Sequence, residues 1–335
     1  MRAAVLTEYN KPWQLKDLPD PKPGPGQVVV RIEACGLCGT DVHVHHGAMR
    51  FVKLPIVPGH EPVGRIVEVG PGVTDLRVGD RVGTGWVQKG CGRCAACQSA
   101  RFWLCADGQS WAQLGGGDAE LMLAWAQGCT LVPDGVSSED AAPMFCAGYT
   151  AISSYRMCRP EPGERVAVVG IGGLGHLAIQ IAKAHGHEVV AVTGTANKQA
   201  EAKELGADEV VVAGDHAGNA LMKAGGADVI MCTTNSAAHV SQALTGLRPR
   251  GRLVTAGALA EPIQIASFAL MFPPRAVLGG TQGDRRDLVD LLELLAKKKI
   301  KPKLELYPLE KVNDVLNRQE AGKVRYRAVL QLGNN

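Results

Sequence analysis

The sequence predicts an α/β protein in which a doubly wound parallel sheet is joined to a second domain, rich in β-strands, that forms a partly open, barrel-like sheet. Three observations support this prediction. Residues 165–193 contain, in order, a buried strand, a glycine-rich turn, an amphipathic helix and another buried strand. The residues that follow alternate between apolar runs and helical segments. Residues 1–135, by contrast, contain short β-branched runs between turn dipeptides, and a chain of 335 residues is long enough for two domains.

The first part of the chain is expected to be mostly β-structure. Runs such as QVVVRIEA, GRIVEVG and DRVGTG favour strands because β-branched side chains fit a pleated sheet, whereas PDPKPGPG at 19–26 is a loop. From Ser137 the periodicity becomes helical. Ser137 and Asp140 are typical of a helix N-terminus, and Pro143 predicts a break in the helix that follows.

The turn after the first buried strand has the pattern G-x-G-x-x-G at Gly170, Gly172 and Gly175. One glycine permits the tight turn, the next lets the backbone approach a pyrophosphate, and the third lets the helix pack close to the strand. Free N–H groups and the positive end of the helix dipole then favour an anion. This context predicts a dinucleotide site of the Rossmann type, and a glycine-rich packing turn is the alternative. The expected cofactor-binding residues are Gly170, Gly172, Gly173, Leu174, Gly175, Thr193, Thr195 and Lys198.

The segments after the second buried strand continue the alternation. KQAEAKELGAD is a helix ended by Gly206, EVVVA, ADVIMCT and GRLVTAG are strands, and residues 276–282 are the last of about six parallel strands. RRDLVDLLELLAKKKI is an amphipathic helix with a basic last turn, and the remaining residues return to β-structure and to the first domain. The expected domains are residues 1–149 with 285–335, and residues 150–284.

Composition excludes several classes of function. Charged residues make up 21% of the chain, the net charge is +3, and no dense run of lysine and arginine indicates a nucleic-acid partner. The N-terminus has no apolar signal region, and no apolar run is long enough to span a membrane. We therefore expect a soluble, cytoplasmic protein without a membrane partner. In such a protein, ten cysteines indicate metal binding or catalysis before disulfides.

Four of these cysteines lie within fifteen residues, at Cys91, Cys94, Cys97 and Cys105. The spacing C-x2-C-x2-C-x7-C can close a tetrahedral thiolate site, for which zinc is the best candidate. An iron–sulfur cluster is the main alternative, but the bacterial ferredoxin run places its fourth cysteine after three residues and before a proline. A closed site of four cysteines has no open position, so it is expected to hold a loop and to carry out no chemistry.

Further metal-binding side chains occur in EACGLCGTDVHVHHG and VPGHEPVG. Taken singly, each cysteine could be a small buried hydrophobe and each histidine could bond to backbone, so spacing alone does not choose among them. The candidates are Cys35, Cys38, Asp41, His43, His45, His46, His60 and Glu61.

The order of motifs along the chain resembles that of one known family. G-x-C-G-T-D-x-H at 36–43, G-H-E at 59–61, the four-cysteine run, F-C-A-G-Y-T at 145–150 and G-x-G-x-x-G at 170–175 follow one another as in the zinc-dependent alcohol dehydrogenases of the medium-chain dehydrogenase/reductase superfamily. The resemblance extends over almost the entire chain. It implies a GroES-like catalytic domain beside the Rossmann domain, and a homodimer or homotetramer.

The resemblance implies two zinc ions per chain. Cys38, His60 and Cys146 would hold the catalytic zinc, and Cys91, Cys94, Cys97 and Cys105 the structural one. Glu61 would be able to exchange onto the metal, and Asp41 would orient His60, as a carboxylate that fixes the tautomer of a metal-binding histidine does. Cys35, Cys129, Cys158 and Cys232 fall outside the family's ligand positions. His45 and His46 also match no ligand position and are expected in a solvated loop.

Three protein ligands leave a fourth position open for water or substrate. The implied reaction is reversible hydride transfer between a nicotinamide cofactor and a small alcohol, aldehyde or ketone. Thr40 is similar to the hydroxyl that passes the alcohol proton outward, and His43 to the imidazole at the end of that relay. One alternative is a zinc-free quinone or enoyl reductase, but Cys38, His60 and Cys146 are all present. The other alternative is a sensing protein that has lost turnover. Such a protein would have lost a ligand or relay residue, and each of these positions is occupied here by the expected residue type.

The preferred cofactor depends on the end of the second buried strand. NAD sites usually carry a carboxylate about twenty residues past the glycine turn, where it binds the ribose 2′-hydroxyl. Here Thr193 occupies that region, and residues 194–200 contain no acid. Because Lys198 could attract a 2′-phosphate, NADP(H) is favoured over NAD(H), with a loop that accepts either as the alternative. The aromatic residues Trp86, Trp111 and Phe51 could form a substrate pocket or simply pack in the core.

Overall fold

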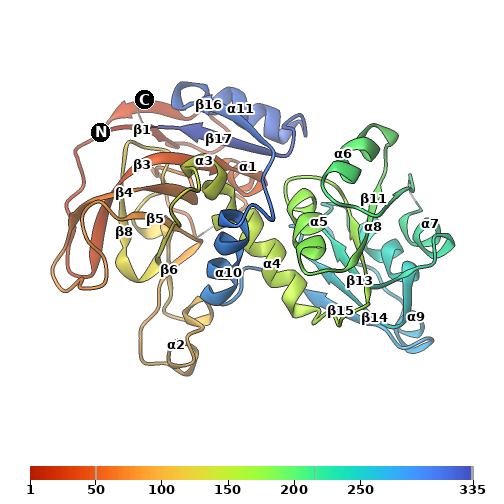
Figure 1. The fold of residues 1–335 in the computed structure, drawn as a ribbon. Helices are drawn as coiled ribbons and strands as arrows, with labels where there is room; N and C mark the ends of the chain where they lie inside the picture. The colour runs from red at the N-terminus through yellow and green to blue at the C-terminus, as the bar shows by residue number, and fades with distance from the viewer. Residues whose placement is uncertain (50, 215, 333–335) are drawn as a thin grey trace. The chain divides into compact units, whose positions relative to one another are not determined.

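The computed structural model describes residues 1–49, 51–214 and 216–332. These residues form two compact units (Figure 1). Unit 1 contains Met1–Cys146, Asp284–Ala296 and Pro302–Asn335, and unit 2 contains Ala147–Gly283 and Lys297–Lys301. Residues 297–301, which the sequence grouped with the first domain, therefore group with unit 2.

Unit 2 is built on a six-stranded parallel sheet in the order β12-β11-β10-β13-β14-β15, so the predicted doubly wound sheet of about six strands is confirmed. The strands are β10 (Arg165–Val169), β11 (Glu188–Thr193), β12 (Glu209–Val212), β13 (Ala227–Cys232), β14 (Leu247–Thr255) and β15 (Ala276–Gly279). The helices are α4 (Ala147–Met157), α5 (Gly175–Ala184), α6 (Gln199–Glu204), α7 (Ala217–Lys223), α8 (Ala237–Ala243) and α9 (Ser267–Met271). Every residue of β10 is buried, because the central strand of such a sheet is covered on both faces.

Unit 1 contains a seven-stranded sheet in the order β16-β17-β3-β4-β5-β9, with β8 also paired to β3. Only β16 and β17 pair in parallel, and no pairing among the described residues closes the sheet into a barrel. The strands are β3 (Gln27–Leu37), β4 (Glu61–Val69), β5 (Arg81–Thr84), β8 (Leu121–Trp125), β9 (Cys129–Leu131), β16 (Leu304–Pro308) and β17 (Arg327–Gln331). Two further sheets of two antiparallel strands pair β1 (Arg2–Val5) with β2 (Gln14–Asp17) and β6 (Val87–Lys89) with β7 (Gln109–Ser110).

Unit 1 also contains helices. They are α1 (Gly39–His45), α2 (Ala95–Gln98), α3 (Ser138–Ala141), α10 (Arg285–Ala296) and α11 (Val312–Glu320). The start of α3 agrees with the sequence, since the Ser137 hydroxyl accepts a hydrogen bond from the Asp140 N–H. A 3₁₀ turn over Ala142–Phe145 follows, so the helical stretch is interrupted around Pro143 as expected.

Three local expectations are wrong. The C-terminal stretch is not all β-structure, because α11 lies between β16 and β17 and buries Val312, Val315 and Leu316 at helical spacing. The basic residues expected in the last turn of α10 come after the helix, which ends at Ala296. His45 lies on α1 and not in a loop.

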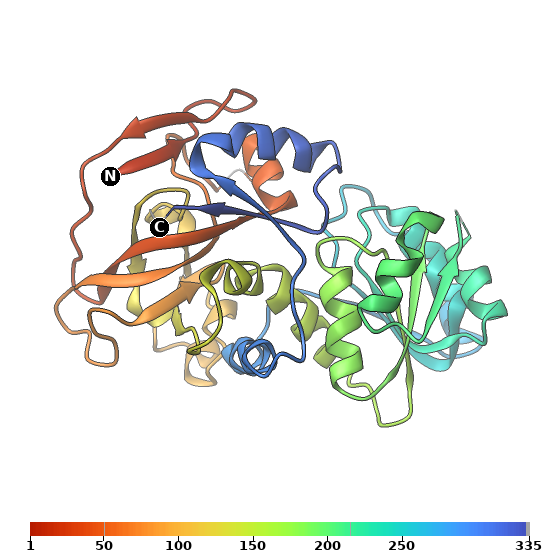
Figure 2. The same ribbon diagram turned by 45° about the horizontal axis from the view of Figure 1, so that its top comes forward.

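The histidines at the end of α1 connect three segments of unit 1. The Trp13 indole N–H donates to His45 Nδ1 at 3.2 Å, and His46 lies between Asn10 and Glu320 at 2.6 and 2.7 Å. Glu320 belongs to α11, which lies beside α1 (Figure 2). These contacts hold the helix that follows Cys38 in place. Within the described ranges, every helix is too short or too polar to cross a bilayer.

Candidate metal centres and active site

Three nitrogen and sulfur donors converge inside unit 1. His60 Nε2 lies 3.4 Å from Cys38 Sγ and 3.3 Å from Cys146 Sγ, and the Glu61 carboxylate lies within 4.8 Å of each of these atoms. They come from distant parts of the chain. Cys38 follows β3, His60 directly precedes β4, Glu61 is the first residue of β4, and Cys146 is the last residue of its segment of unit 1.

The donor set fits a zinc ion. Zn–S bonds of about 2.3 Å and Zn–N bonds of about 2.0 Å place tetrahedral sulfur and nitrogen ligands roughly 3.5 Å apart, close to the two observed separations. Burial is also suitable, since Cys38 is 6% exposed and His60 is fully buried. Hydrogen bonding from the Cys146 thiol, supported by the charge of Arg327, holds the pKa of Cys38 well below its usual range, which favours the thiolate that binds metal.

Asp41 orients the histidine of this cluster. Its Oδ1 lies 3.2 Å from His60 Nδ1, while Oδ2 accepts the Cys38 backbone N–H at 2.8 Å. Cys38 is the N-cap of α1, and its sulfur also accepts the Thr40 N–H at 3.2 Å. With Nδ1–H donated to Asp41, His60 Nε2 is left as the lone-pair donor toward the two sulfurs. The motif C-G-T-D therefore builds one ligand and the group that orients another.

Glu61 is held by an arginine that sequence analysis missed. Both oxygens of the fully buried Glu61 carboxylate accept hydrogen bonds from Arg327 Nη2, one of them at 2.6 Å. Burial raises the pKa of Glu61 to about 7, although the Arg327 charge opposes that shift. Gly36 leaves room for the carboxylate, because a Cβ at this position would lie 2.0 Å from Glu61 Oε2. The pair thus keeps an acidic group beside the three donors.

A second acid missed by sequence analysis lies behind His60. Asp118 is 1% exposed, and neither of its carboxylate oxygens has a hydrogen-bond partner among the described residues. Burial, followed by the nearby Asp41 charge, raises the pKa of Asp118 to about 8. Its backbone N–H donates to Pro58 O at 3.0 Å, and Gly117 N–H donates to Gly59 O at 2.8 Å. This segment thereby fixes the loop that carries His60.

The Asp118 shift predicts a pH-dependent stability. An unfolded aspartate titrates near pH 3.9, so the folded protein binds the extra proton between about pH 4 and pH 8. The resulting stability is complete below pH 4 and is lost as the pH rises through 8, by at most about 1.4 kcal/mol per pH unit. Asp118→Asn should therefore raise the urea midpoint relative to wild type more at pH 8 than at pH 5. An equal change at both pH values would show that Asp118 is ionised throughout.

The four cysteines expected at a structural site also come together. One sulfur from each of Cys91, Cys94, Cys97 and Cys105 lies within 4.8 Å of the others, and the Cys91 N–H donates to Cys105 Sγ at 3.3 Å. The backbone N–H groups of Arg93 and Cys94 lower the pKa of Cys91 to about 6. Four converging sulfurs fit a tetrahedral zinc without an open position. We call residues 91–105 the four-cysteine lobe.

The glycine turn lies in unit 2, at the start of α5. Gly170 has φ +93°, which a side chain would strain, and a Cβ on Gly175 would lie 1.9 Å from Gly170 O. Gly172, in contrast, faces open space, since nothing lies within 4 Å of its Cβ position. Leu174 is the N-cap residue of α5, and its side chain accepts no hydrogen bond from the first N–H groups of the helix. The first and third glycines meet steric demands, and the second leaves backbone accessible to a ligand.

The loop after β11 carries the other expected cofactor residues. Thr193 is 5% exposed, and its hydroxyl donates to Thr195 O and accepts the Thr195 N–H at 3.2 and 3.3 Å. Lys198 Nζ donates to Ile171 O in the glycine turn at 2.8 Å. The structure therefore places Lys198 against the turn, while the Thr193 hydroxyl bonds within its own loop.

Aromatic side chains line one side of the cysteine–histidine cluster. The Trp86 ring lies edge-on to His60 with centroids 5.3 Å apart, and Trp111 lies 6.3 Å from the same imidazole. Phe51, which is 52% exposed, contacts Trp86 at 6.0 Å. Trp111 is fully buried and belongs to the core. Trp86 and Phe51 thus form a row of aromatic side chains that runs from His60 to the surface of unit 1.

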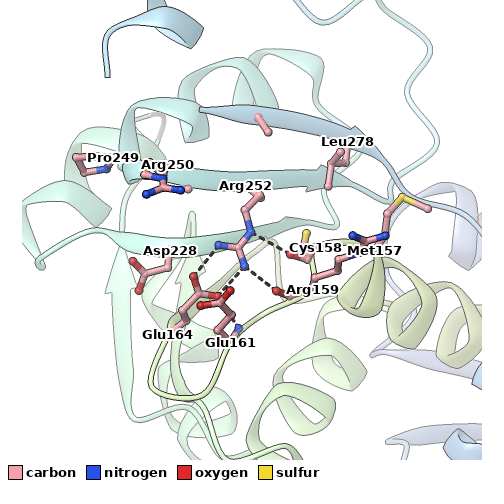
Figure 3. Close-up of a pocket in the computed structure, with 12 residues that line it drawn as sticks. Met157, Cys158, Arg159, Glu161, Glu164, Asp228, Pro249, Arg250, Arg252 and Leu278 are labelled. Carbon is pink, nitrogen blue, oxygen red and sulfur yellow. Dashed lines mark hydrogen bonds and ion pairs between the residues drawn. The ribbon is translucent and has the colours of Figure 1, made fainter. Parts of the chain in front are cut away.

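A separate hollow of about 730 Å³ lies on unit 2, between the end of α4 and strands β14 and β15. In it, the Arg252 guanidinium donates to both oxygens of Glu164 at 2.6 Å and to the carbonyl groups of Cys158 and Arg159 (Figure 3). None of the predicted site residues lines this hollow, and its central arginine is already fully engaged. We assign it no role in the chemistry.

Comparisons with known proteins agree with this arrangement. The family model described as "Alcohol dehydrogenase GroES-like domain" matches residues 24–134, and the model described as "Zinc-binding dehydrogenase" matches residues 173–297. An alcohol dehydrogenase of Geobacillus stearothermophilus is 43% identical over 336 residues, which cover 99% of this chain and all of that protein.

Solved structures give the same result. The alcohol dehydrogenase of the hyperthermophilic archaeon Aeropyrum pernix is 32% identical with a TM-score of 0.91, and the match covers 99% of this chain and 100% of that one. A cobalt- and zinc-bound thermostable alcohol dehydrogenase from Pyrobaculum aerophilum is 30% identical with a TM-score of 0.87, covering 99% of each chain. The chain thus belongs to the zinc-dependent alcohol dehydrogenases of the medium-chain dehydrogenase/reductase superfamily, enzymes that use zinc and a nicotinamide dinucleotide to interconvert alcohols with aldehydes or ketones.

Proposed function

We propose that Cys38, His60 and Cys146 hold the catalytic zinc and that the four-cysteine lobe holds a second, structural zinc. The convergence of three donors, of which Cys38 and His60 are buried and His60 is oriented by Asp41, is the observation that carries this proposal. It also argues against a zinc-free reductase and against a sensing protein, since either would have lost a ligand position. In this proposal unit 1 is the catalytic domain and unit 2 is the dinucleotide-binding domain.

The bound zinc would act as a Lewis acid on the substrate oxygen, and the nicotinamide would exchange a hydride with the substrate carbon. The protein residues then have separate tasks. Asp41 keeps the His60 tautomer that leaves Nε2 free for the metal. The Thr40 hydroxyl takes the alcohol proton and His43, one turn further along α1, passes it toward solvent. Glu61, held by Arg327, would offer an additional oxygen ligand beside the three donors.

We further propose that the enzyme prefers NADP(H). Two observations support this preference: the loop after β11 carries no acid between residues 194 and 200, and Lys198 lies against the glycine turn. A lysine close to the ribose and phosphates attracts a 2′-phosphate, whereas an aspartate at the end of the second strand would repel it.

Thr193→Asp is expected to shift the preference toward NADH. The new carboxylate can bind a ribose 2′-hydroxyl and repels a 2′-phosphate, so the ratio of kcat/KM for NADPH to that for NADH should fall by about tenfold or more. Initial rates of nicotinamide oxidation on a panel of aliphatic and aromatic aldehydes measure this ratio. Thr193→Asn has nearly the same shape without the charge and is the matched control. An unchanged ratio in Thr193→Asp would mean that the 2′-position is recognised elsewhere.

The substrates we propose are small alcohols, aldehydes and ketones, with Trp86 and Phe51 as one wall of their pocket. We also propose a homodimer or homotetramer. Phe268, Met271 and Phe272 are 69, 56 and 62% exposed beside β15, the last strand of its sheet, and such an apolar edge favours pairing with a second copy. Light scattering that gives a monomer would contradict this assembly. A cytoplasmic location stays a prediction.

A further inference from the structure

The chain passes between the two units at four places. These follow Cys146, Gly283, Ala296 and Lys301. Helix α10 is therefore bounded at both ends by such crossings, since unit 2 precedes it up to Gly283 and resumes at Lys297. Relative motion of two units is the default expectation when they are joined by a few segments, and the residues at the crossings absorb it.

The crossing before α10 is held from both sides. In unit 2, the Tyr149 hydroxyl donates to Gly283 O at 2.7 Å and the Gly283 N–H donates to Ser153 Oγ at 3.0 Å. In unit 1, the Trp103 indole N–H donates to Asp284 Oδ1 at 3.1 Å, and Arg101 Nε lies 3.6 Å from Asp284 Oδ2. Two consecutive residues are thus each fixed to the body of a different unit.

The unit 1 side of this contact comes entirely from the four-cysteine lobe. Arg101 and Trp103 lie between the third and fourth cysteines; Trp103 is part of the 3₁₀ turn Phe102–Leu104, and Arg101 is the N-cap of that turn. The Arg285 guanidinium, at the first residue of α10, lies over the Phe102 ring at 5.3 Å. The lobe is packed tightly at this point, because a Cβ on Gly90 would lie 2.5 Å from Cys97 Sγ and 2.8 Å from Phe102 Cβ.

The crossing after Lys301 is held on its unit 2 side by hydrogen bonds between the Gln180 side chain and the Lys301 backbone. Gln180 on α5 donates to Lys301 O at 3.0 Å and accepts the Lys301 N–H at 2.8 Å, both within unit 2. The contacts of the lobe named above are therefore made at the crossing that begins α10. The position of the lobe there depends on the four sulfurs that close the loop.

We propose that the four-cysteine lobe is a latch on the crossing at Gly283–Asp284, and that Trp103 and Asp284 are positioning residues of the reaction. The inference rests on the proposed roles of the two metal sites. Turnover needs the metal held by unit 1 and the dinucleotide held by unit 2 together, so a looser crossing lowers the fraction of time in which both are correctly oriented. The closed metal site therefore contributes to catalysis without contacting substrate.

Trp103→Phe tests the latch, since it keeps an aromatic ring and removes only the indole N–H. We expect kcat to fall by about 3- to 10-fold, as for the loss of one hydrogen bond. Zinc content and the dinucleotide dissociation constant should remain at wild-type values, because each depends on one unit alone. Amide hydrogen exchange in residues 283–287 should become faster, while exchange in β10 and β13 should not change.

Trp125→Phe is the matched control. Trp125 also belongs to unit 1, but its indole nitrogen has no hydrogen-bond partner among the described residues, so its variant should match wild type in rate and exchange. Asp284→Asn keeps the acceptor oxygen and should also stay close to wild type, because the Arg101 pair is half exposed and weak. Asp284→Leu should reproduce the Trp103→Phe result.

Wild-type kcat and wild-type exchange at 283–287 in Trp103→Phe would overturn the latch. A lower kcat accompanied by loss of zinc would also overturn it, since the contact would then serve only the integrity of the lobe. Failure of the proposed function has a different signature. In that case the wild-type protein itself would lack turnover or the second zinc, whereas the exchange comparison would still report whether Trp103 fixes the crossing.

Discussion

Cys38→Ser is expected to abolish turnover, with a loss of kcat of about 10³-fold or more. The substitution removes one of three donors around the catalytic metal, and a serine hydroxyl is a poor substitute for a thiolate ligand. The rate with an aldehyde and reduced nicotinamide measures the effect, and metal analysis of the same sample should show the loss of one zinc. Binding of the dinucleotide should persist, because its predicted site lies in unit 2.

The matched control for this variant is Cys158→Ser. Cys158 is also buried, at 2% exposure, but it lies in unit 2 and belongs to neither cluster of metal-binding side chains. Its variant should keep both zinc ions and most of the activity. Wild-type activity in Cys38→Ser would refute the ligand assignment, and a comparable loss in Cys158→Ser would show that cysteine replacement damages the fold in general.

Arg327→Leu is expected to give the largest loss of stability. Arg327 is 3% exposed and its partner Glu61 is fully buried, so removal of the guanidinium leaves a buried carboxylate without its counter-charge. Breaking one side of such a pair costs about 3–5 kcal/mol. The midpoint of urea denaturation measures this cost. The double variant Arg327→Leu/Glu61→Gln should recover part of it, because it leaves no buried charge.

A surface arginine provides the comparison. Arg286 pairs with Asp290 on α10 at 2.8 Å, but its side chain is 81% exposed, and an exposed pair of this kind contributes at most about 1 kcal/mol. Arg286→Leu should therefore leave the urea midpoint nearly unchanged. If Arg327→Leu were equally mild, the Glu61 carboxylate would have to be protonated in the native protein, and its role as an alternative metal ligand would be doubtful.

Much of the fold was predictable because its signals are local. The glycine turn, the buried strand before it and the amphipathic helix after it lie within 29 consecutive residues, and the structure places them as β10, the turn and α5. The four cysteines of the lobe likewise lie close together in sequence, so their convergence required only a short loop. The spacing of Val312, Val315 and Leu316 also indicates a helix at α11. That pattern was overlooked because the residues on either side favour β-structure.

The remaining features depend on contacts between distant residues. Arg327 and Glu61 are 266 positions apart, and Trp103 and Asp284 are 181 apart, so no periodicity or spacing connects them. Asp118 could not be recognised as a buried acid, because an aspartate after three glycines is typical of an exposed turn. Burial of these polar groups is decided by the packing of unit 1, which only the three-dimensional structure shows.

The central claim is that two distinct zinc sites are present and that only one of them supports the reaction. The most direct test follows zinc content and turnover together while a chelator removes metal from the wild-type protein. We predict two zinc ions per chain at the start, and turnover that falls to zero as the first is lost, because the closed four-cysteine site holds its metal more firmly than the open three-ligand site. A starting content of one zinc, or full activity after loss of the first, would contradict the account.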